Sequence, residues 1–353
     1  MKRYAMLIVI LTVGLLPAAD DPKQAAVQKE LDRLHGQWEL VSAEKDGKTI
    51  PPGTFKGERA LFQGDQSMVK KGDKVLQRST LTIDPTAQPK TFEEAVTDGI
   101  NKGKKKHGIY EVDGDTLRIC QVRDGQDRPK EFAGKHGDSR RAYRSAVDQT
   151  LQPYRLFVPE SYNASKATPL LMALHGMGGD ENSLFDSYDN GLLKREAERV
   201  GFIVACPKGR DSASMYRGSA EQDVLDVMAD VQHNYKVDAA RIYLMGHSMG
   251  AYGTWSIAMN HPDLFAALGP ISGGGSAAGM AKIRHIPQYV VHGDDDRTVP
   301  LMQSRNMVEA GKKAGAEIVY VEVPGGSHVS VAAPAFAAML DFFARHQKHA
   351  GNQ

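Results

Sequence analysis

The stretch IYLMGHSMGAYGTW at residues 242–255 governs how the C-terminal part of this sequence is expected to fold. It starts with an apolar run typical of a buried strand and ends in a run typical of a helix. Between the two lies G-x-S-x-G, formed by Gly246, Ser248 and Gly250. A serine at the apex of a sharp strand-to-helix turn needs small residues two positions to either side. The stretch therefore predicts a nucleophile elbow with Ser248 as the nucleophile.

Strand-like and helix-like runs alternate around this elbow, from about residue 147 to residue 353. The apolar strand-like runs lie at 154–158, 170–174, 202–205, 242–245, 289–291 and 318–321. Between them, the stretch 222–235 places four apolar residues on one helical face. Strands that alternate with helices indicate a mostly parallel sheet with helices on both faces. We therefore predict an α/β-hydrolase fold for residues 147–353.

The acidic partner of the serine is expected after a strand, downstream of the elbow. In this fold the catalytic residues follow the order Ser, acid, His. The strand at 289–291 leads into HGDDDRTVP at 292–300, on the sheet edge where α/β proteins build their sites. Three consecutive aspartates leave an ambiguity that spacing alone does not settle. We assign Asp296 as the acid and interpret Asp294 and Asp295 as turn and capping residues.

The general base is expected on the loop after the last strand. A serine hydroxyl is a weak nucleophile and needs a base within hydrogen-bond reach. His328 ends the glycine-rich segment 324–328, which follows a strand at 318–323 and can bring the imidazole towards the elbow. We assign His328 as the base. The remaining histidines considered are interpreted as packing, loop-bracing or tail residues: His175, His247, His292, His346 and His349.

An oxyanion needs N–H donors that are already in place, each contributing about 3 kcal/mol of transition-state stabilisation. One predicted donor is the backbone of Met249, directly after the nucleophile. The other is the backbone of Met177, in the segment LHGMGG at 174–179 after an early strand. Neither G-x-x-x-x-G-K nor G-x-G-x-x-G is present, which argues against phosphate binding by this glycine run.

The N-terminal part of the chain, residues 22–146, has a different pattern. A helix is expected at 22–34, followed by short strands separated by Asp-Gly turns. The clearest strands lie at 38–41, 79–83, 108–112 and 116–120. Several short strands at close spacing predict a small antiparallel barrel or sandwich.

The first nineteen residues resemble a secretory signal peptide. Lys2 and Arg3 precede an apolar run of twelve residues from Ala5 to Leu16, followed by a small-residue cleavage site near Ala19. A membrane span needs about 20 apolar residues. We therefore expect cleavage, a secreted or periplasmic protein, and no membrane span.

Composition excludes several other classes. Lys and Arg number 44 against 43 Asp and Glu, which argues against nucleic acid or anionic lipid as the main partner. The two cysteines, Cys120 and Cys206, lie far apart and are interpreted as buried and unpaired. No H-E-x-x-H or paired-cysteine motif is present, so no metal or cofactor is expected.

From about residue 154 onwards, the sequence resembles secreted esterases of the poly(3-hydroxybutyrate) depolymerase and feruloyl-esterase branch. It is also similar to the prolyl oligopeptidase-like hydrolase domain. The residues that carry the likeness lie at 174–179, 221–224, 241–250, 252–255, 262–267 and 292–300. The resemblance implies hydrolysis of carboxylic esters through an acyl-enzyme, with Ser248, Asp296 and His328 as the triad. One departure is Ala251, where relatives often carry glycine; alanine is small enough to keep the elbow.

The N-terminal part resembles a lipocalin-like module of planctomycete-type bacterial proteins. The likeness rests on residues 34–44, 108–117 and 127–129 and implies no particular chemistry.

Two alternative functions remain open at this point. A serine peptidase of the prolyl oligopeptidase type would normally carry a gating domain such as a propeller, and the segment before residue 147 is too short for one. A non-catalytic ligand-binding protein with a vestigial hydrolase domain is disfavoured because all three triad residues are present. The sequence does not fix the acyl group, the alcohol or the oligomeric state. Feruloyl or acetyl esters on polysaccharide, short polyesters and simple short-chain esters all fit.

Overall fold

The computed structural model describes residues 22–40, 44–45, 48–49, 57–99, 101–113, 116–129 and 136–348. The signal peptide predicted at 1–19 lies outside these residues and stays a prediction. The chain divides into two compact units, each described here by itself. Among the described residues, no helix is both long and apolar enough to span a membrane.

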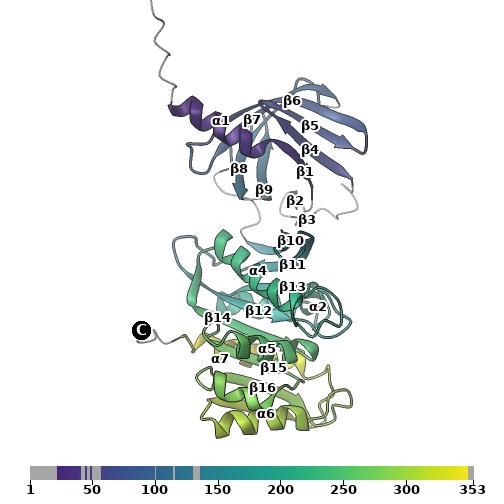
Figure 1. The fold of residues 1–353 in the computed structure, drawn as a ribbon, viewed down its shortest axis with the longest axis vertical. Helices are drawn as coiled ribbons and strands as arrows, with labels where there is room; N and C mark the ends of the chain where they lie inside the picture. Colours follow the sequence, from purple (N-terminus) through teal and green to yellow (C-terminus); the bar gives the residue numbers. More distant parts are fainter. Residues whose placement is uncertain are drawn as a thin grey trace, which may run out of the picture. The chain divides into compact units, whose positions relative to one another are not determined.

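The first unit is a helix, α1 (Pro22–Leu34), with a seven-stranded antiparallel sheet (Figure 1). The strand order is β1-β4-β5-β6-β7-β8-β9. The strands are β1 (Gly36–Glu39), β4 (Glu58–Gln63), β5 (Gln66–Lys71), β6 (Lys74–Asp84), β7 (Thr91–Gly99), β8 (Lys105–Asp113) and β9 (Thr116–Arg123). A further short pair, β2 (Glu44–Lys45) with β3 (Lys48–Thr49), groups with the second unit.

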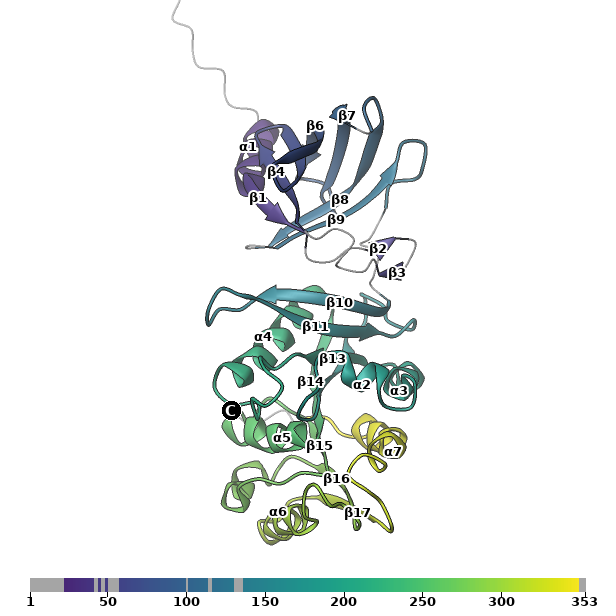
Figure 2. The same ribbon diagram turned by 90° about the vertical axis from the view of Figure 1, so that its right-hand side faces the viewer.

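Alternation of side chains gives this sheet its core. Along β6, Leu81 and Ile83 are buried on one face, while the residues between and beside them are more exposed. They pack with Phe92 and Tyr110 and with Leu34 of α1. The predicted antiparallel architecture is confirmed. The sheet is a curled, open half-barrel rather than a closed barrel, because the described strands include no pairing between β1 and β9 (Figure 2).

The second unit is an eight-stranded, mostly parallel sheet. Its order is β10-β11-β13-β12-β14-β15-β16-β17, and only the pairs β10–β11 and β11–β13 are antiparallel. The strands are β10 (Gly137–Arg144), β11 (Leu151–Val158), β12 (Thr168–Leu174), β13 (Ile203–Pro207), β14 (Val237–His247), β15 (Ala267–Ile271), β16 (Gln288–Gly293) and β17 (Ile318–Val323).

Helices cover both faces of this sheet. The elements α4 (Ser219–Asn234), α5 (Met249–Asn260), η2 (Ala277–Ile283) and α6 (Met302–Lys313) share one core, and α2 (Ser183–Asp186), α3 (Leu192–Val200) and α7 (Ala332–Ala344) share the other. Figure 2 shows the two helical layers. This arrangement confirms the predicted α/β-hydrolase fold.

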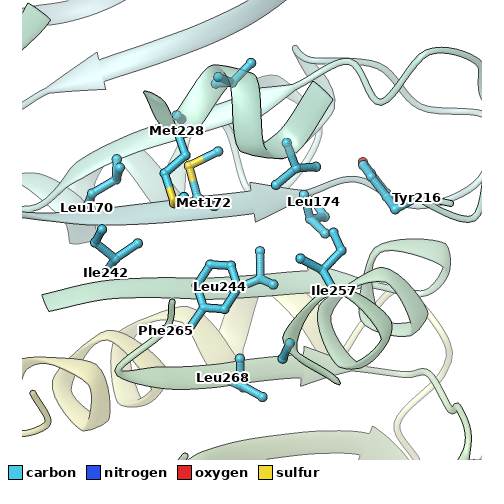
Figure 3. Packing of buried hydrophobic residues seen from close by; sticks show 14 of the residues in the cluster. Leu170, Met172, Leu174, Tyr216, Met228, Ile242, Leu244, Ile257, Phe265 and Leu268 are labelled. Atoms are coloured by element: carbon cyan, nitrogen blue, oxygen red, sulfur yellow. The ribbon is translucent and has the colours of Figure 1, made fainter. Parts of the chain in front are cut away.

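The strand β12 shows why such a sheet is buried on both sides. Leu170, Met172 and Leu174 point into the core under α4 and α5, as Figure 3 shows. Leu171 and Ala173 point into the opposite core, and all five are fully buried. A continuous apolar run is the pattern that a central parallel strand requires. Burying each large aliphatic side chain contributes about 1.5–3 kcal/mol, so β12 is a firm support for the loop that follows it.

The strand β10 is assigned differently by the structure than by the sequence. The sequence pattern placed residues up to 146 in the first domain, but β10 pairs with β11 along its whole length. The guanidinium of Arg155 on β11 donates to both oxygens of Asp138 on β10, at 2.7 and 2.6 Å. A short antiparallel strand shows the same alternation of buried and exposed side chains in the sheet of either unit. Only its backbone pairing therefore shows to which sheet β10 belongs. A boundary near residue 132 keeps β10 with its sheet.

Both cysteines are free. Cys206 on β13 is buried as expected, whereas Cys120 on β9 is only half-buried.

Candidate active site

The nucleophile elbow lies between β14 and α5. Ser248 has φ 57° and ψ −118°, a backbone conformation that non-glycine residues rarely adopt. The flanking positions must be glycine because the backbone packs too closely there for a side chain. A Cβ on Gly246 would lie 2.2 Å from the Gly250 carbonyl oxygen. A Cβ on Gly250 would lie 2.2 Å from the Leu174 carbonyl oxygen. The Ser248 N–H donates to the carbonyl of Ile271 at 2.9 Å, which fixes the turn against β15.

Asp296 and His328 lie on the loops after β16 and β17, and they meet. Oδ2 of Asp296 is 2.7 Å from Nδ1 of His328. Oδ1 accepts hydrogen bonds from the N–H groups of Thr298 and Val299, at 2.9 and 2.8 Å. Burial would raise the pKa of Asp296, but these hydrogen bonds outweigh it and hold the pKa below its ordinary value. The carboxylate is therefore ionised and held in one orientation.

The two neighbouring aspartates have other partners. Oδ1 of Asp294 accepts the N–H of Gly325 at 2.6 Å, which braces the loop that carries His328. Asp295 is exposed and pairs with Arg297 at 3.1 Å. Among the contacts of the described residues, only Asp296 of the three aspartates reaches His328.

His247 connects the elbow to the loop of the base. It immediately precedes Ser248, and its Nε2 is 2.8 Å from the His328 carbonyl oxygen. The His247 and His328 rings are 4.8 Å apart, centroid to centroid. The contacts of the described residues include no hydrogen bond from the Ser248 hydroxyl to His328. Such bonds are often loose in the free enzyme and tighten only with substrate.

The loop after β12 lies against Ser248. A Cβ on Gly176 would be 3.4 Å from the Ser248 Cβ. The N–H of Gly178 donates to Ser212 at 2.8 Å and that of Gly179 to Gly176 at 3.1 Å. No contact in the described part of the chain uses the N–H of Met177 or Met249, so both donors are available to an oxyanion. The site thus forms at the carboxyl ends of β12, β14, β16 and β17, as the topology requires.

Buried polar residues outside the predicted set support this loop. The hydroxyl of the fully buried Tyr216 accepts the N–H of His175 at 3.0 Å. The two ring nitrogens of His175 lie 2.8 Å from the carbonyl oxygens of Gly176 and Lys208. The bracing role expected for His175 therefore fits its contacts. Tyr216 is not predictable from the sequence, because no spacing or motif relates the segment around it to the glycine loop.

Within the described residues, no group of three or more His, Cys, Asp or Glu side chains is arranged to hold a metal ion.

The second unit has relatives among known proteins. Residues 145–281 match the family described as "Putative esterase". A probable feruloyl esterase C of Aspergillus flavus is 30% identical over 190 residues, which make up 50% of this chain and 68% of the fungal protein. The chain belongs to the esterase family. This esterase is also 29% identical, over 144 residues, to a bifunctional acetylxylan esterase/xylanase of Neocallimastix patriciarum. That match covers 40% of this chain but only 21% of the relative.

Solved structures agree on the fold of the esterase. A thermostable esterase superposes with a TM-score of 0.55 at 22% identity, over 80% of this chain and 90% of that one. A ferulic acid esterase gives a TM-score of 0.52 at 19% identity, over 59% of this chain and 97% of that one. The second unit is thus an esterase-family serine hydrolase, a class that acts on carboxylic esters. This membership favours ester hydrolysis over the peptidase and the non-catalytic alternatives.

Proposed function

We propose that this protein is a secreted serine esterase that releases feruloyl or acetyl groups from plant cell-wall polysaccharide through an acyl-enzyme. The observation that carries the proposal is the 2.7 Å contact between Asp296 and His328. The loop of His328 is bonded to His247, the residue directly before the strained Ser248. The names of the relatives, feruloyl and acetylxylan esterases, suggest the substrate class. The apolar run at 5–16 supports secretion.

In the first half-reaction, Nε2 of His328 takes the proton of the Ser248 hydroxyl as Oγ attacks the ester carbonyl carbon. The carbonyl π-electrons move to oxygen, and the N–H groups of Met249 and Met177 stabilise that oxyanion. The intermediate then expels the alcohol, which leaves with the proton from His328. Asp296 holds the imidazole in the tautomer that this transfer needs.

In the second half-reaction, water replaces the alcohol. His328 takes a proton from the water as its oxygen attacks the acyl carbon, and the same two N–H groups stabilise the second oxyanion. Collapse breaks the bond between the acyl carbon and Ser248 Oγ, which recovers its proton from His328. The carboxylic acid is released and the free enzyme is restored.

The nucleophile is tested by Ser248→Ala, which should abolish ester turnover and covalent labelling by a fluorophosphonate. The far-UV circular dichroism spectrum should stay unchanged, because the methyl group fits wherever the hydroxymethyl group did. Persistent labelling of a folded Ser248→Ala variant would refute the assignment.

The substrate class is tested with a panel: acetylated xylan, feruloylated arabinoxylan, 4-nitrophenyl acetate, a poly(3-hydroxybutyrate) film and a peptide anilide. We expect the highest kcat/KM on one of the two polysaccharide esters and none on the anilide. Preference for the polyester or turnover of the anilide would contradict the proposal.

Secretion is tested separately, by sequencing the N-terminus of the protein recovered from the medium or periplasm. We expect it to begin near Asp20.

A further inference from the structure

The carboxylate of Asp296 has a second imidazole beside it. His292, near the end of β16, is completely buried. Its Nε2 lies 3.1 Å from Oδ2 of Asp296 and 3.0 Å from the carbonyl oxygen of Val299. Its Nδ1 lies 2.6 Å from the hydroxyl of Ser304 on α6, which is also fully buried. The mechanism proposed above uses neither side chain.

These contacts determine which nitrogen of His292 carries the hydrogen. Both neighbours of Nε2 are acceptors only, an ionised carboxylate and a backbone carbonyl, so Nε2 must be the donor. Nδ1 is then an acceptor, and the Ser304 hydroxyl, which also lies 2.9 Å from the carbonyl oxygen of Gly273, shares its one hydrogen between these two acceptors. Burial lowers the pKa of His292, which keeps the ring neutral with one N–H.

Oδ2 of Asp296 is therefore approached by two imidazole N–H groups, at 2.7 Å from His328 and 3.1 Å from His292. We propose that His292 is a positioning residue of the esterase, which acts on the base His328 through Asp296, and that Ser304 holds the ring of His292 in place. The N–H of His292 holds Oδ2 of Asp296 towards His328 and draws negative charge away from this oxygen.

Other ionisable groups face this pair from neighbouring elements. His247 comes from β14 and Tyr252 from α5. Glu322 on β17 lies opposite His292 in register and pairs with Arg305 of α6 at 2.7 Å. Among the described contacts, none of these four side chains bonds the carboxylate of Asp296. A change at His292 should therefore alter the base through Asp296 rather than through them.

The test compares His292→Leu with His292→Gln, by following kcat/KM for 4-nitrophenyl acetate against pH. Leucine removes the donor, whereas the glutamine amide can still donate from the same place. Without the donor, more negative charge remains on Oδ2, which favours the protonated form of His328. Because the base must be neutral to act, the acid limb of the His292→Leu profile should move to higher pH by about half a unit or more.

The triad aspartate, which acts directly on the base, contributes about 10⁴-fold to kcat, and a group that acts through it should contribute less, about tenfold. We therefore expect kcat of His292→Leu to fall by at least that factor with KM unchanged, because the buried ring does not touch substrate. His292→Gln should stay within about threefold of the wild type with an unshifted profile. An unshifted profile in a folded His292→Leu, or equal shifts in both variants, would overturn the proposal.

Ser304→Ala keeps the test decisive if His292→Leu does not fold. Loss of the hydroxyl leaves Nδ1 without its partner, so the ring and the Nε2–H that it directs at Oδ2 are held less firmly. The same upward shift is expected, with a smaller amplitude, and a wild-type profile would count against the proposal. The inference rests on the proposed triad, whose own failure would appear differently, as retained activity in Ser248→Ala.

Discussion

Oδ2 of Asp296 and Nδ1 of His328 are 2.7 Å apart although 32 residues separate them in the chain. The loop after β16 supplies the first and the loop after β17 supplies the second, and the parallel pairing of these strands brings the loops together. Asp294 adds a direct connection, since its carboxylate accepts the N–H of Gly325. The three aspartates thus differ in their contacts: Asp296 reaches His328, Asp294 braces the loop that carries His328, and Asp295 is exposed.

We predict that Asp296→Asn lowers kcat by about 10⁴-fold but leaves measurable activity, because an amide stabilises the wrong imidazole tautomer. His328→Ala should fall near the level of Ser248→Ala, about 10⁶-fold down, since no base remains. Kinetics on 4-nitrophenyl acetate would measure both. The matched controls, Asp294→Asn and Asp295→Asn, should stay within about tenfold of the wild type. If either control lost most of its kcat while Asp296→Asn lost little, the wrong aspartate would be assigned.

Gly250→Ala should destabilise the second unit, because its Cβ would meet the Leu174 carbonyl oxygen at 2.2 Å and the His175 carbonyl oxygen at 2.9 Å. Backbone atoms cannot swing aside, so the loop with the oxyanion donors must shift. We expect a loss of about 1–3 kcal/mol in the free energy of unfolding, measured in urea, together with a fall in kcat. Ala251→Gly, one residue further along α5, should cost only about 1 kcal/mol. Equal stability of Gly250→Ala and the wild type would contradict this.

His247 should make the folded state sensitive to acid. Burial lowers its pKa to about 4, from an ordinary value of 6.5. The unfolded chain therefore binds a proton near pH 6.5, whereas the folded chain resists protonation until about pH 4. The contribution of the neutral His247 ring to the free energy of unfolding is fully present above pH 6.5. It is lost as the pH falls to about 4. At about 1.4 kcal/mol per pKa unit, the loss approaches ~3 kcal/mol.

The measurement for His247 is urea unfolding at pH 7 and at pH 4.5. His247→Gln is the control, since glutamine can still donate to the His328 carbonyl oxygen but does not titrate. The variant should lose less stability between the two pH values than the wild type. Parallel losses in both proteins would show that His247 is not the group responsible.

Truncation should separate the two possible boundaries. A variant beginning at residue 132 keeps β10 and should retain kcat on 4-nitrophenyl acetate, because the proposed triad and oxyanion donors lie in the second unit. A variant beginning at residue 145 loses β10 and with it Asp138, which also contacts Lys194 at 2.6 Å. Removing one partner of such a largely buried ion pair costs about 3–5 kcal/mol. A folded variant from residue 132 with little kcat would refute the modular interpretation.

The sequence predicted what local motifs encode. The turn at Ser248 is recognisable because its glycines, strand and helix are contiguous, and Asp296 and His328 follow in the order that the fold requires. Partners from distant segments were not predictable in the same way. Tyr216 and Ser304 reach the site through the packing of a loop and of α6, which leaves no spacing in the sequence. The sheet to which β10 belongs was missed for the same reason.

The conformation of Ser248 has a consequence for selection and engineering. Ser248 has φ 57° and ψ −118°, a backbone conformation that glycine adopts readily. For a residue with a side chain this conformation costs about 1–3 kcal/mol. A glycine at position 248 would relieve this strain, so the sequence with Ser248 is not the most stable sequence for this fold. A library screened for thermal tolerance alone would be expected to enrich glycine at position 248 and so discard the proposed nucleophile. Any search for a hardier esterase of this kind has to select for turnover at every round.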